Sequence, residues 1–113
     1  SSMNHLKVKD GVWIPHLHRN MVRAIPHILD AFEHHGYETV LTEAYATSGH
    51  MVNSKHYENP CAATDWRTWT SPTSGVQIDK ETKHKIAETI RLKLGRKYDV
   101  AVEWSHIHIE WDE

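Results

Sequence analysis

The chain has 113 residues, of which 39% are hydrophobic and 25% charged, and its formal net charge is −2 at pH 7. This length suits one domain, the composition suffices for a packed core, and the single cysteine, Cys61, excludes an internal disulfide bond. Because the sequence has no strongly basic stretch and no long apolar run, we expect it neither to bind nucleic acid nor to span a membrane.

The N-terminal residues contain no signal-peptide core, so we expect a protein made in the cytoplasm. Ser1 and Ser2 precede Met3, which we take as the native start, with the two serines as a cloning remnant. We treat residues 1–113 as one domain and expect a monomer.

The first expected elements are a short strand and a helix. Residues 5–13 alternate apolar and polar side chains, which predicts an edge strand or an ordered arm. Apolar residues from Ile14 to Phe32 recur at three- and four-residue spacing, which predicts a helix that ends near Gly36. Pro15 suits the first turn of this helix, whereas Pro26 predicts a kink or break.

The second half predicts more strands around one further helix. Residues 37–45 are rich in β-branched and aromatic residues and predict a central strand, whereas residues 46–53 and 66–75 have loop and turn composition. A helix is expected over residues 80–94, followed by strands over 98–102 and 105–111. This order predicts an α+β fold, a small antiparallel sheet with helices packed on one face.

Two stretches carry the candidate chemistry. The stretch 54–65 contains His56 and Asp65, which we place on either side of a tight polar turn. In the last expected strand, period two places His106 and His108 on one face, with isoleucines on the other. A buried histidine that lacks a partner for a ring nitrogen costs about 1–3 kcal/mol. Two histidines on one face therefore call for polar partners or a metal ion.

A histidine, an aspartate and a second histidine with an open fourth position make a catalytic zinc site. One zinc ion held by His56, Asp65 and one of the two late histidines would lower the pKa of bound water from about 15.7 toward about 7. Glu103, just before the histidine strand, is the candidate general base. The oxyanion needs a further donor, either His50 or the late histidine that does not bind metal.

These residues also match a known pattern. The zinc D-alanyl-D-alanine peptidases carry a Ser-x-His-x-x-Gly-x-Ala-x-Asp motif and a late Glu-x-x-His or His-x-His strand; the chain has, in the same order, Ser54, His56, Ala63, Asp65, Glu103, His106 and His108. The chain resembles the superfamily of these peptidases and the hedgehog signalling domain over about residues 14–111. Thr42-Glu43, Gly49-His50, His56-Tyr57-Glu58 and His106-Ile107-His108 look especially like the hedgehog version.

The resemblance implies a hedgehog- and DD-peptidase-like fold and a zinc metallopeptidase. Its implied substrate is a bacterial peptidoglycan stem peptide, cleaved at a D-alanine or L-Ala–D-Glu link by a carboxypeptidase or an endopeptidase, as in a phage endolysin that acts at the cell wall. By the Glu-x-x-His pattern His106 is the third zinc ligand, and by the hedgehog pattern it is His108. We favour His108, which leaves His106 as a catalytic donor and Glu103 as the base.

The chain departs from the family in two places. His56 and Asp65 are nine positions apart where the family has seven, and the excess falls at Asn59-Pro60-Cys61. The arginine that many of these peptidases carry after the central strand is absent, and His50 stands near its position. We assign His50 and Ser54 to substrate binding.

Two alternatives to a zinc peptidase stay open. The chain is a non-catalytic zinc domain that binds a partner, or an assembly protein whose histidines satisfy one another. Cys61 is interpreted as a structural cysteine; as a fourth zinc ligand it would close the site and abolish hydrolysis, and as a nucleophile it would need a paired base.

Overall fold

The computed structural model describes residues 5–112, and the expectation about Ser1, Ser2 and Met3 lies outside that range. Within it, two helices and five strands are joined by loops and one short 3-10 helix. In chain order they are β1 (Leu6–Val8), α1 (Arg19–His34), β2 (Thr39–Glu43), the 3-10 helix η1 (Lys55–Tyr57), β3 (Ala63–Arg67), α2 (Lys80–Leu94), β4 (Tyr98–Val102) and β5 (His106–Trp111). None of the helices in these described residues has the length and apolar character needed to cross a membrane.

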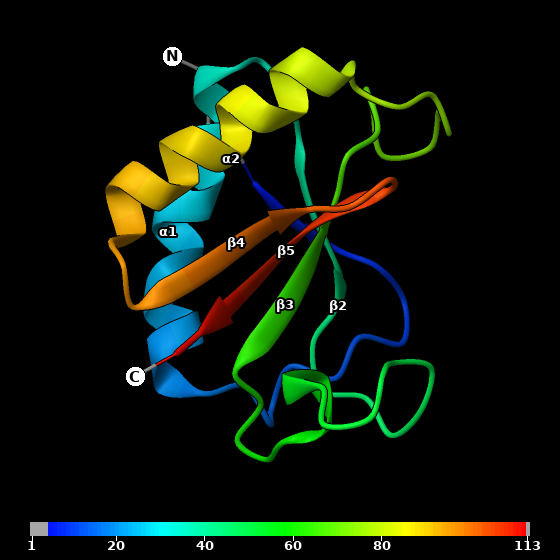
Figure 1. Ribbon diagram of the computed structural model, residues 1–113. Coiled ribbons are helices and arrows are strands. Elements are labelled where there is room, and N and C mark those ends of the chain that lie inside the picture. Colours follow the sequence, from blue (N-terminus) through cyan, green and yellow to red (C-terminus); the bar gives the residue numbers. More distant parts are fainter. Residues whose placement is uncertain (1–4, 113) are drawn as a thin grey trace.

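The five strands form one mixed sheet in the order β1-β2-β3-β5-β4 (Figure 1). β1 pairs with β2 in parallel, and the other neighbours are antiparallel. The prediction of an antiparallel sheet is therefore wrong for β1. The physical reason is the connection, because α1 lies between β1 and β2 and returns the chain to the end of the sheet from which it started.

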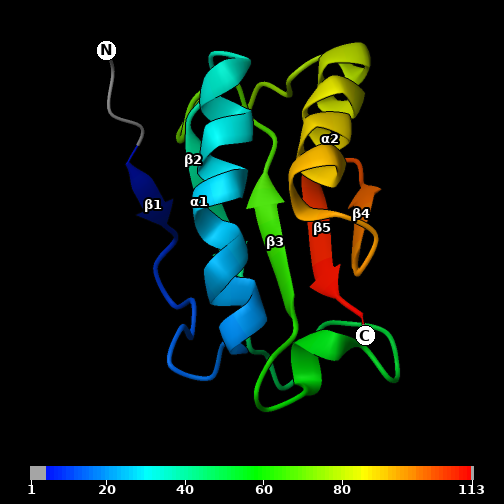
Figure 2. The ribbon, with the colours of Figure 1, turned by 90° about the vertical axis from the view of Figure 1, so that its left-hand side faces the viewer.

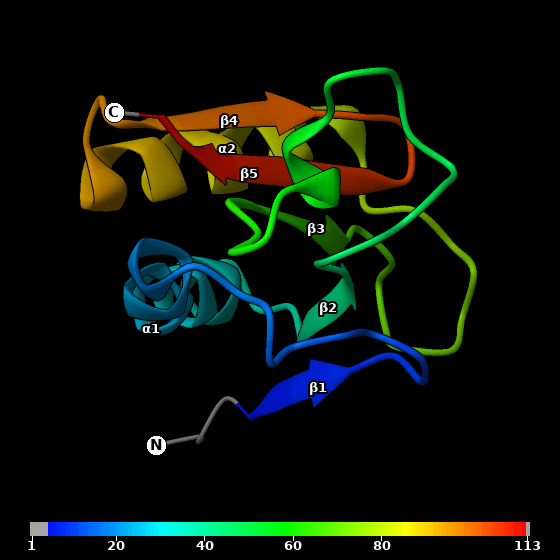
Figure 3. The ribbon, with the colours of Figure 1, turned by 90° about the horizontal axis from the view of Figure 1, so that it is seen from below.

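Both helices cover the same face of the sheet, as predicted for an α+β fold (Figures 2 and 3). A single core joins one stripe of each helix to alternate residues of the strands. Its largest fully buried members are Met21, Ile28 and Phe32 of α1, Ile86 and Ile90 of α2, Leu41, Trp66, Ile107 and Ile109 of the sheet, and Ile78 just before α2. The alternation in β5 thus sends its isoleucines into the core and its histidines to the opposite face.

Helix α1 differs from its prediction at its start and at its proline. The helix begins at Arg19, where His18 is the N-cap and its Nδ1 accepts a hydrogen bond from the Asn20 amide at 3.0 Å. It then runs through Pro26 without a break. Pro26 lies on the exposed face, and burial of the opposite face, including Met21, offsets the roughly 3 kcal/mol that an interior proline costs.

In the second half of the chain, three elements agree closely with the prediction and one strand, β3, was not predicted. Helix α2 and strand β4 have their predicted bounds, and β5 begins one residue late, at His106. Asp65 lies in the middle of β3, between β2 and β5, and the turn predicted from residue 66 onward is wrong for Trp66 and Arg67, which belong to the same strand. The sequence Ala63–Arg67 has few strand-favouring residues, and only its two partner strands make it central.

Candidate metal centre

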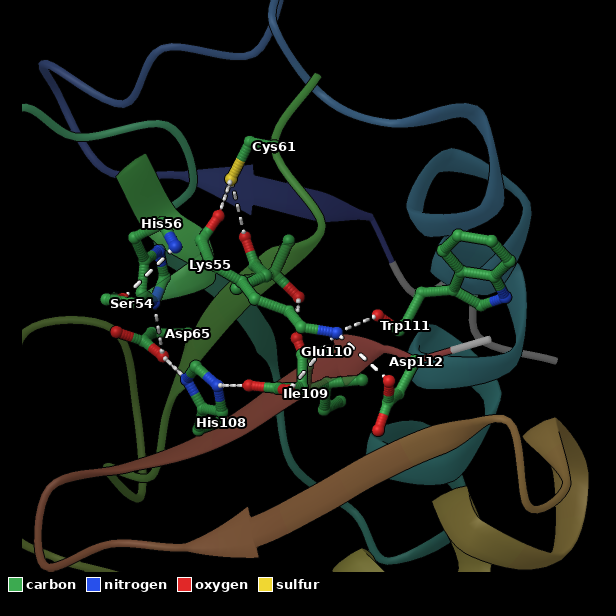
Figure 4. Close-up of polar contacts among 12 residues, drawn as sticks. Ser54, Lys55, His56, Cys61, Asp65, His108, Ile109, Glu110, Trp111 and Asp112 are labelled. Atoms are coloured by element: carbon green, nitrogen blue, oxygen red, sulfur yellow. Dashed lines mark hydrogen bonds and ion pairs between the residues drawn. The ribbon is translucent and has the colours of Figure 1, made fainter. Parts of the chain in front are cut away.

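Asp65 is the centre of the polar cluster on the sheet face opposite the helices. The register between β3 and β5 places Asp65 directly across from His108. Its Oδ1 lies 2.8 Å from His108 Nδ1 and 3.2 Å from His56 Nε2 (Figure 4), and 3.7 Å from His106 Nε2. Burial would raise the pKa of Asp65, but the hydrogen bonds and charges of these histidines outweigh that effect and hold it well below its ordinary value. Asp65 is therefore an ionised buried carboxylate surrounded by imidazoles.

His56 reaches Asp65 from the short helix η1. Ser54 caps that helix, its Oγ accepting a hydrogen bond from the His56 amide at 3.1 Å. The imidazole is 1% exposed, and its Nδ1 donates to the carbonyl of Ala44 at 2.6 Å. With that proton on Nδ1, the buried Nε2 faces Asp65 without hydrogen-bond geometry to any described residue. When this nitrogen gives up its proton, its lone pair is available to a metal ion.

The ionisation of His56 depends on Asp65. Burial by itself would lower the pKa of the imidazole. The neighbouring Asp65 carboxylate and the backbone carbonyl of Ala44 outweigh burial and raise the pKa to about 10. Without a metal, His56 and Asp65 therefore form a buried ion pair.

His108 differs from His56 in having a carboxylate at each ring nitrogen. Nδ1 contacts Asp65 Oδ1 at 2.8 Å, and Nε2 contacts Glu110 Oε1 at 2.9 Å. Burial by itself would lower the pKa of His108. The hydrogen bonds to Asp65 and Glu110 raise the pKa by more than burial lowers it, so that it lies above its ordinary value. Both contacts of the ring are with groups that keep it protonated when no metal displaces the proton on Nδ1.

His50 lies against His56 on the loop that follows β2. Its ring stacks on that of His56 at 4.1 Å between centroids and 18° between planes, and its Nε2 lies 3.2 Å from Glu43 Oε1. The Tyr57 hydroxyl holds the backbone of His50, accepting from its amide and donating to its carbonyl at 2.6 Å each.

His50, His56 and Asp65 have ligand atoms that all lie within 4.8 Å of one another, and this group could hold a metal ion. Nearly parallel stacked rings, however, direct their nitrogen lone pairs side by side and not toward one point. His108 is not a member of that group, and its ring lies at 65° to that of His56, with 5.2 Å between centroids. The 3.2 Å between His56 Nε2 and Asp65 Oδ1 is close to the edge of about 3.3 Å expected between ligands of a tetrahedral zinc ion with bonds near 2.0 Å, whereas the 2.8 Å between His108 Nδ1 and the same oxygen is a hydrogen-bond distance.

The cluster forms part of the wall of an open cavity of about 790 Å³. Every candidate site residue from the sequence lines it: His50, Ser54, His56, Asp65, Glu103, His106 and His108. Other lining residues include Lys9, which the sequence did not single out, and Thr42 and Glu43, to which only the hedgehog resemblance pointed. Glu103 is exposed on the turn between β4 and β5, where its amide donates to the His106 carbonyl at 2.8 Å.

Cys61 is fully buried and is not among the residues that line this cavity. Its Sγ donates to the carbonyls of Ala63 at 3.2 Å and Lys55 at 3.5 Å. Its backbone accepts a hydrogen bond from His18 and donates one to His16. These contacts fit the interpretation of Cys61 as a structural residue beneath η1.

Two further residues beside the cluster had no predicted function, namely Glu110 and Lys55. Period two placed Glu110 on the histidine face of β5, which was a usable signal. No sequence signal pointed to Lys55, because the residues that it contacts, Trp111 and Asp112, lie more than fifty positions further along the chain.

Comparisons of the chain with protein-family models, with curated proteins and with solved structures gave no match.

Proposed function

We propose that the chain is a zinc-dependent hydrolase that cleaves a peptide bond in bacterial peptidoglycan stem peptides. The single observation that carries the proposal is the convergence of His56 Nε2 and His108 Nδ1 on Asp65 Oδ1 at the wall of an open cavity. Two imidazoles and a carboxylate form a three-ligand zinc set, and the cavity leaves the fourth position accessible to water and substrate.

The proposed reaction divides the work among the residues that line the cavity. Zinc bound by these ligands would supply a water molecule with a pKa near 7. The Glu103 carboxylate would serve as the general base toward such a water and would pass the proton to the leaving nitrogen. His106, whose Nε2 lies 3.7 Å from Asp65 Oδ1, donates a hydrogen bond to the developing oxyanion. His50 and Ser54 line the cavity beside them and contact the substrate.

The substrate class rests on the resemblance to the zinc D-alanyl-D-alanine peptidases. The longer connection between His56 and Asp65 is compatible with it, because the two side chains still meet at 3.2 Å. The excess residues lie in the segment 58–62, which connects η1 to β3 and contains neither His56 nor Asp65.

The experiment compares zinc content and turnover in wild type and Glu103→Gln. Wild type should bind one zinc ion per chain and release new amino groups from peptidoglycan fragments. Glu103→Gln should keep the zinc and lose about 10²- to 10⁴-fold in turnover, the usual contribution of a general base. Glu81→Gln, an exposed change on α2, serves as the matched control and should retain full turnover.

Two outcomes contradict the proposal. If wild type binds zinc but releases no amine, and Glu103→Gln is indistinguishable from it, the chain is a non-catalytic zinc domain that binds a partner. If wild type binds no zinc and a chelator leaves its melting temperature unchanged, the histidine cluster satisfies itself and the metal assignment is wrong.

A further inference from the structure

The imidazole of His108 has two nitrogens, and only one can face the proposed metal. The polar contacts around the ring distinguish them (Figure 4). Nδ1 faces Asp65 Oδ1 at 2.8 Å, and Nε2 faces Glu110 Oε1 at 2.9 Å on the opposite side of the ring. A carboxylate at Nε2 accepts a hydrogen bond only if that nitrogen keeps its proton. Asp65 likewise favours a proton on Nδ1 in the metal-free protein, so the two contacts differ only when a metal takes the place of that proton; Glu110 then holds the remaining proton on Nε2 and leaves the lone pair on Nδ1.

We propose that Glu110 is a positioning residue, which fixes the ring orientation and tautomer of His108 and so presents Nδ1 to the metal. This inference rests on the proposed ligand set, and it adds the residue that holds His108 in the orientation needed to bind the metal. Histidine ligands in metalloproteins commonly donate their second N–H to a carboxylate, and loss of that partner costs about 10- to 100-fold in metal affinity or activity.

Glu110 is itself held by Lys55. The Lys55 ammonium lies 3.7 Å from Glu110 Oε2, while Glu110 Oε1 contacts His108. The same ammonium donates to the Trp111 carbonyl at 2.9 Å and to Asp112 Oδ1 at 3.3 Å. The Lys55 and Glu110 side chains are 26% and 23% exposed, so solvent screens this pair less than a bridge on the open surface. The two oxygens of Glu110 thus have different partners, and the carboxylate has little freedom to rotate.

The position of Lys55 in the chain gives this contact a second effect. Lys55 directly precedes the proposed ligand His56 in η1, whereas Glu110 and Trp111 follow His108 in β5. The contacts of Lys55 therefore tie η1 to the end of β5 (Figure 4). The tie holds the two ligand-bearing segments at a fixed separation before any metal arrives, which reduces the ordering needed on binding.

The test measures zinc affinity by competition with a chromophoric chelator. Glu110→Ala should bind zinc about 10- to 100-fold more weakly than wild type. Glu110→Gln should retain most of the affinity, because its amide oxygen still accepts from Nε2–H. Lys55→Met should lose less than Glu110→Ala, and Lys55→Arg should be close to wild type. Asp99→Asn is the matched control, since Asp99 is the cross-strand partner of Glu110 on β4 and should leave zinc affinity unchanged.

A second readout separates positioning from general stability. Long-range proton–nitrogen correlation spectra of the zinc-loaded protein report which nitrogen of His108 carries the proton. Wild type and Glu110→Gln should show the Nε2–H form with zinc on Nδ1, and Glu110→Ala should show a mixture of the two tautomers. The melting temperature of each metal-free variant is measured alongside, so that a folding defect is recognised. Should Glu110→Ala fail to fold, Glu110→Gln and Lys55→Met carry the test.

The outcomes distinguish this inference from the proposed function. If wild type binds zinc and Glu110→Ala binds it equally tightly with the same tautomer, the positioning role is wrong and the proposed function stands. If Glu110→Ala does not fold, the other two variants decide. The positioning role is then wrong if Lys55→Met binds zinc as tightly as wild type and Glu110→Gln changes the tautomer of His108. If wild type binds no zinc, the inference and the proposed function fail together.

Discussion

Raising the pH above 7 should destabilise the metal-free protein, because Asp65 holds a proton on His56. The pKa of His56 is raised to about 10 in the folded chain, against an ordinary value near 6.5. This stabilising contribution is fully present below pH 6.5 and is lost as the pH rises toward 10. Between those limits the folded chain binds one proton more than the unfolded chain. The free energy of unfolding should therefore fall by about 1.4 kcal/mol per pH unit.

From pH 7.5 to 9.0 this slope amounts to a loss of about 2 kcal/mol, a large part of the 5–15 kcal/mol that stabilises a typical domain. His108 acts in the same direction, because its pKa is also raised. The assay is urea denaturation in the presence of a chelator at several pH values, for wild type and Asp65→Asn. The difference between the two slopes isolates the histidines that face Asp65 from all other titrating groups.

Zinc should reverse the sign of the slope, because a metal on His56 and His108 replaces protons and binds more tightly as the pH rises. Asp112→Asn, which removes an exposed carboxylate beside Lys55, should keep the wild-type slope in metal-free protein. Equal slopes for wild type and Asp65→Asn would refute the reasoning, since they would show that Asp65 does not retain a proton on these histidines.

Two further predictions concern the core and the turn that carries Glu103. Ile107→Ala removes a fully buried side chain of β5 and should cost about 2–5 kcal/mol in urea denaturation, whereas Trp104→Ala, at an 80% exposed position, should change stability by less than about 0.5 kcal/mol. Lys83 is buried on α2 and donates to the Trp104 carbonyl at 2.6 Å. Lys83→Met should loosen this turn and lower turnover at unchanged zinc affinity; an unchanged turnover, or a parallel loss of zinc affinity, would contradict this.

Much of the site could be predicted from local sequence pattern. Strict alternation in β5 identified the face that carries His106 and His108, and the motif order selected His56, Asp65 and Glu103. These residues line one cavity in the structure. The prediction succeeded because the twofold period of a strand is a property of the backbone and needs no knowledge of its partners.

The remaining features depended on contacts between distant segments. Nothing local marks Ala63–Arg67 as a central strand, and the turn predicted from residue 66 onward was wrong for Trp66 and Arg67 for that reason. The same holds for the stacking of His50 on His56 and for the contact between Lys55 and Glu110, which join different elements.

The sequence by itself determined helix α2, the face of β5 that carries the histidines and the kinds of side chain in the polar cluster, because each depends on residue type and short-range periodicity. The tertiary structure decided which nitrogen of each histidine faces Asp65. That choice depends on the register of β3 against β5, where a slip of one residue would move Asp65 to the opposite face of the sheet. It also depends on the groups that contact the other nitrogen of each ring. These are the Ala44 carbonyl at His56 Nδ1 and the Glu110 carboxylate at His108 Nε2.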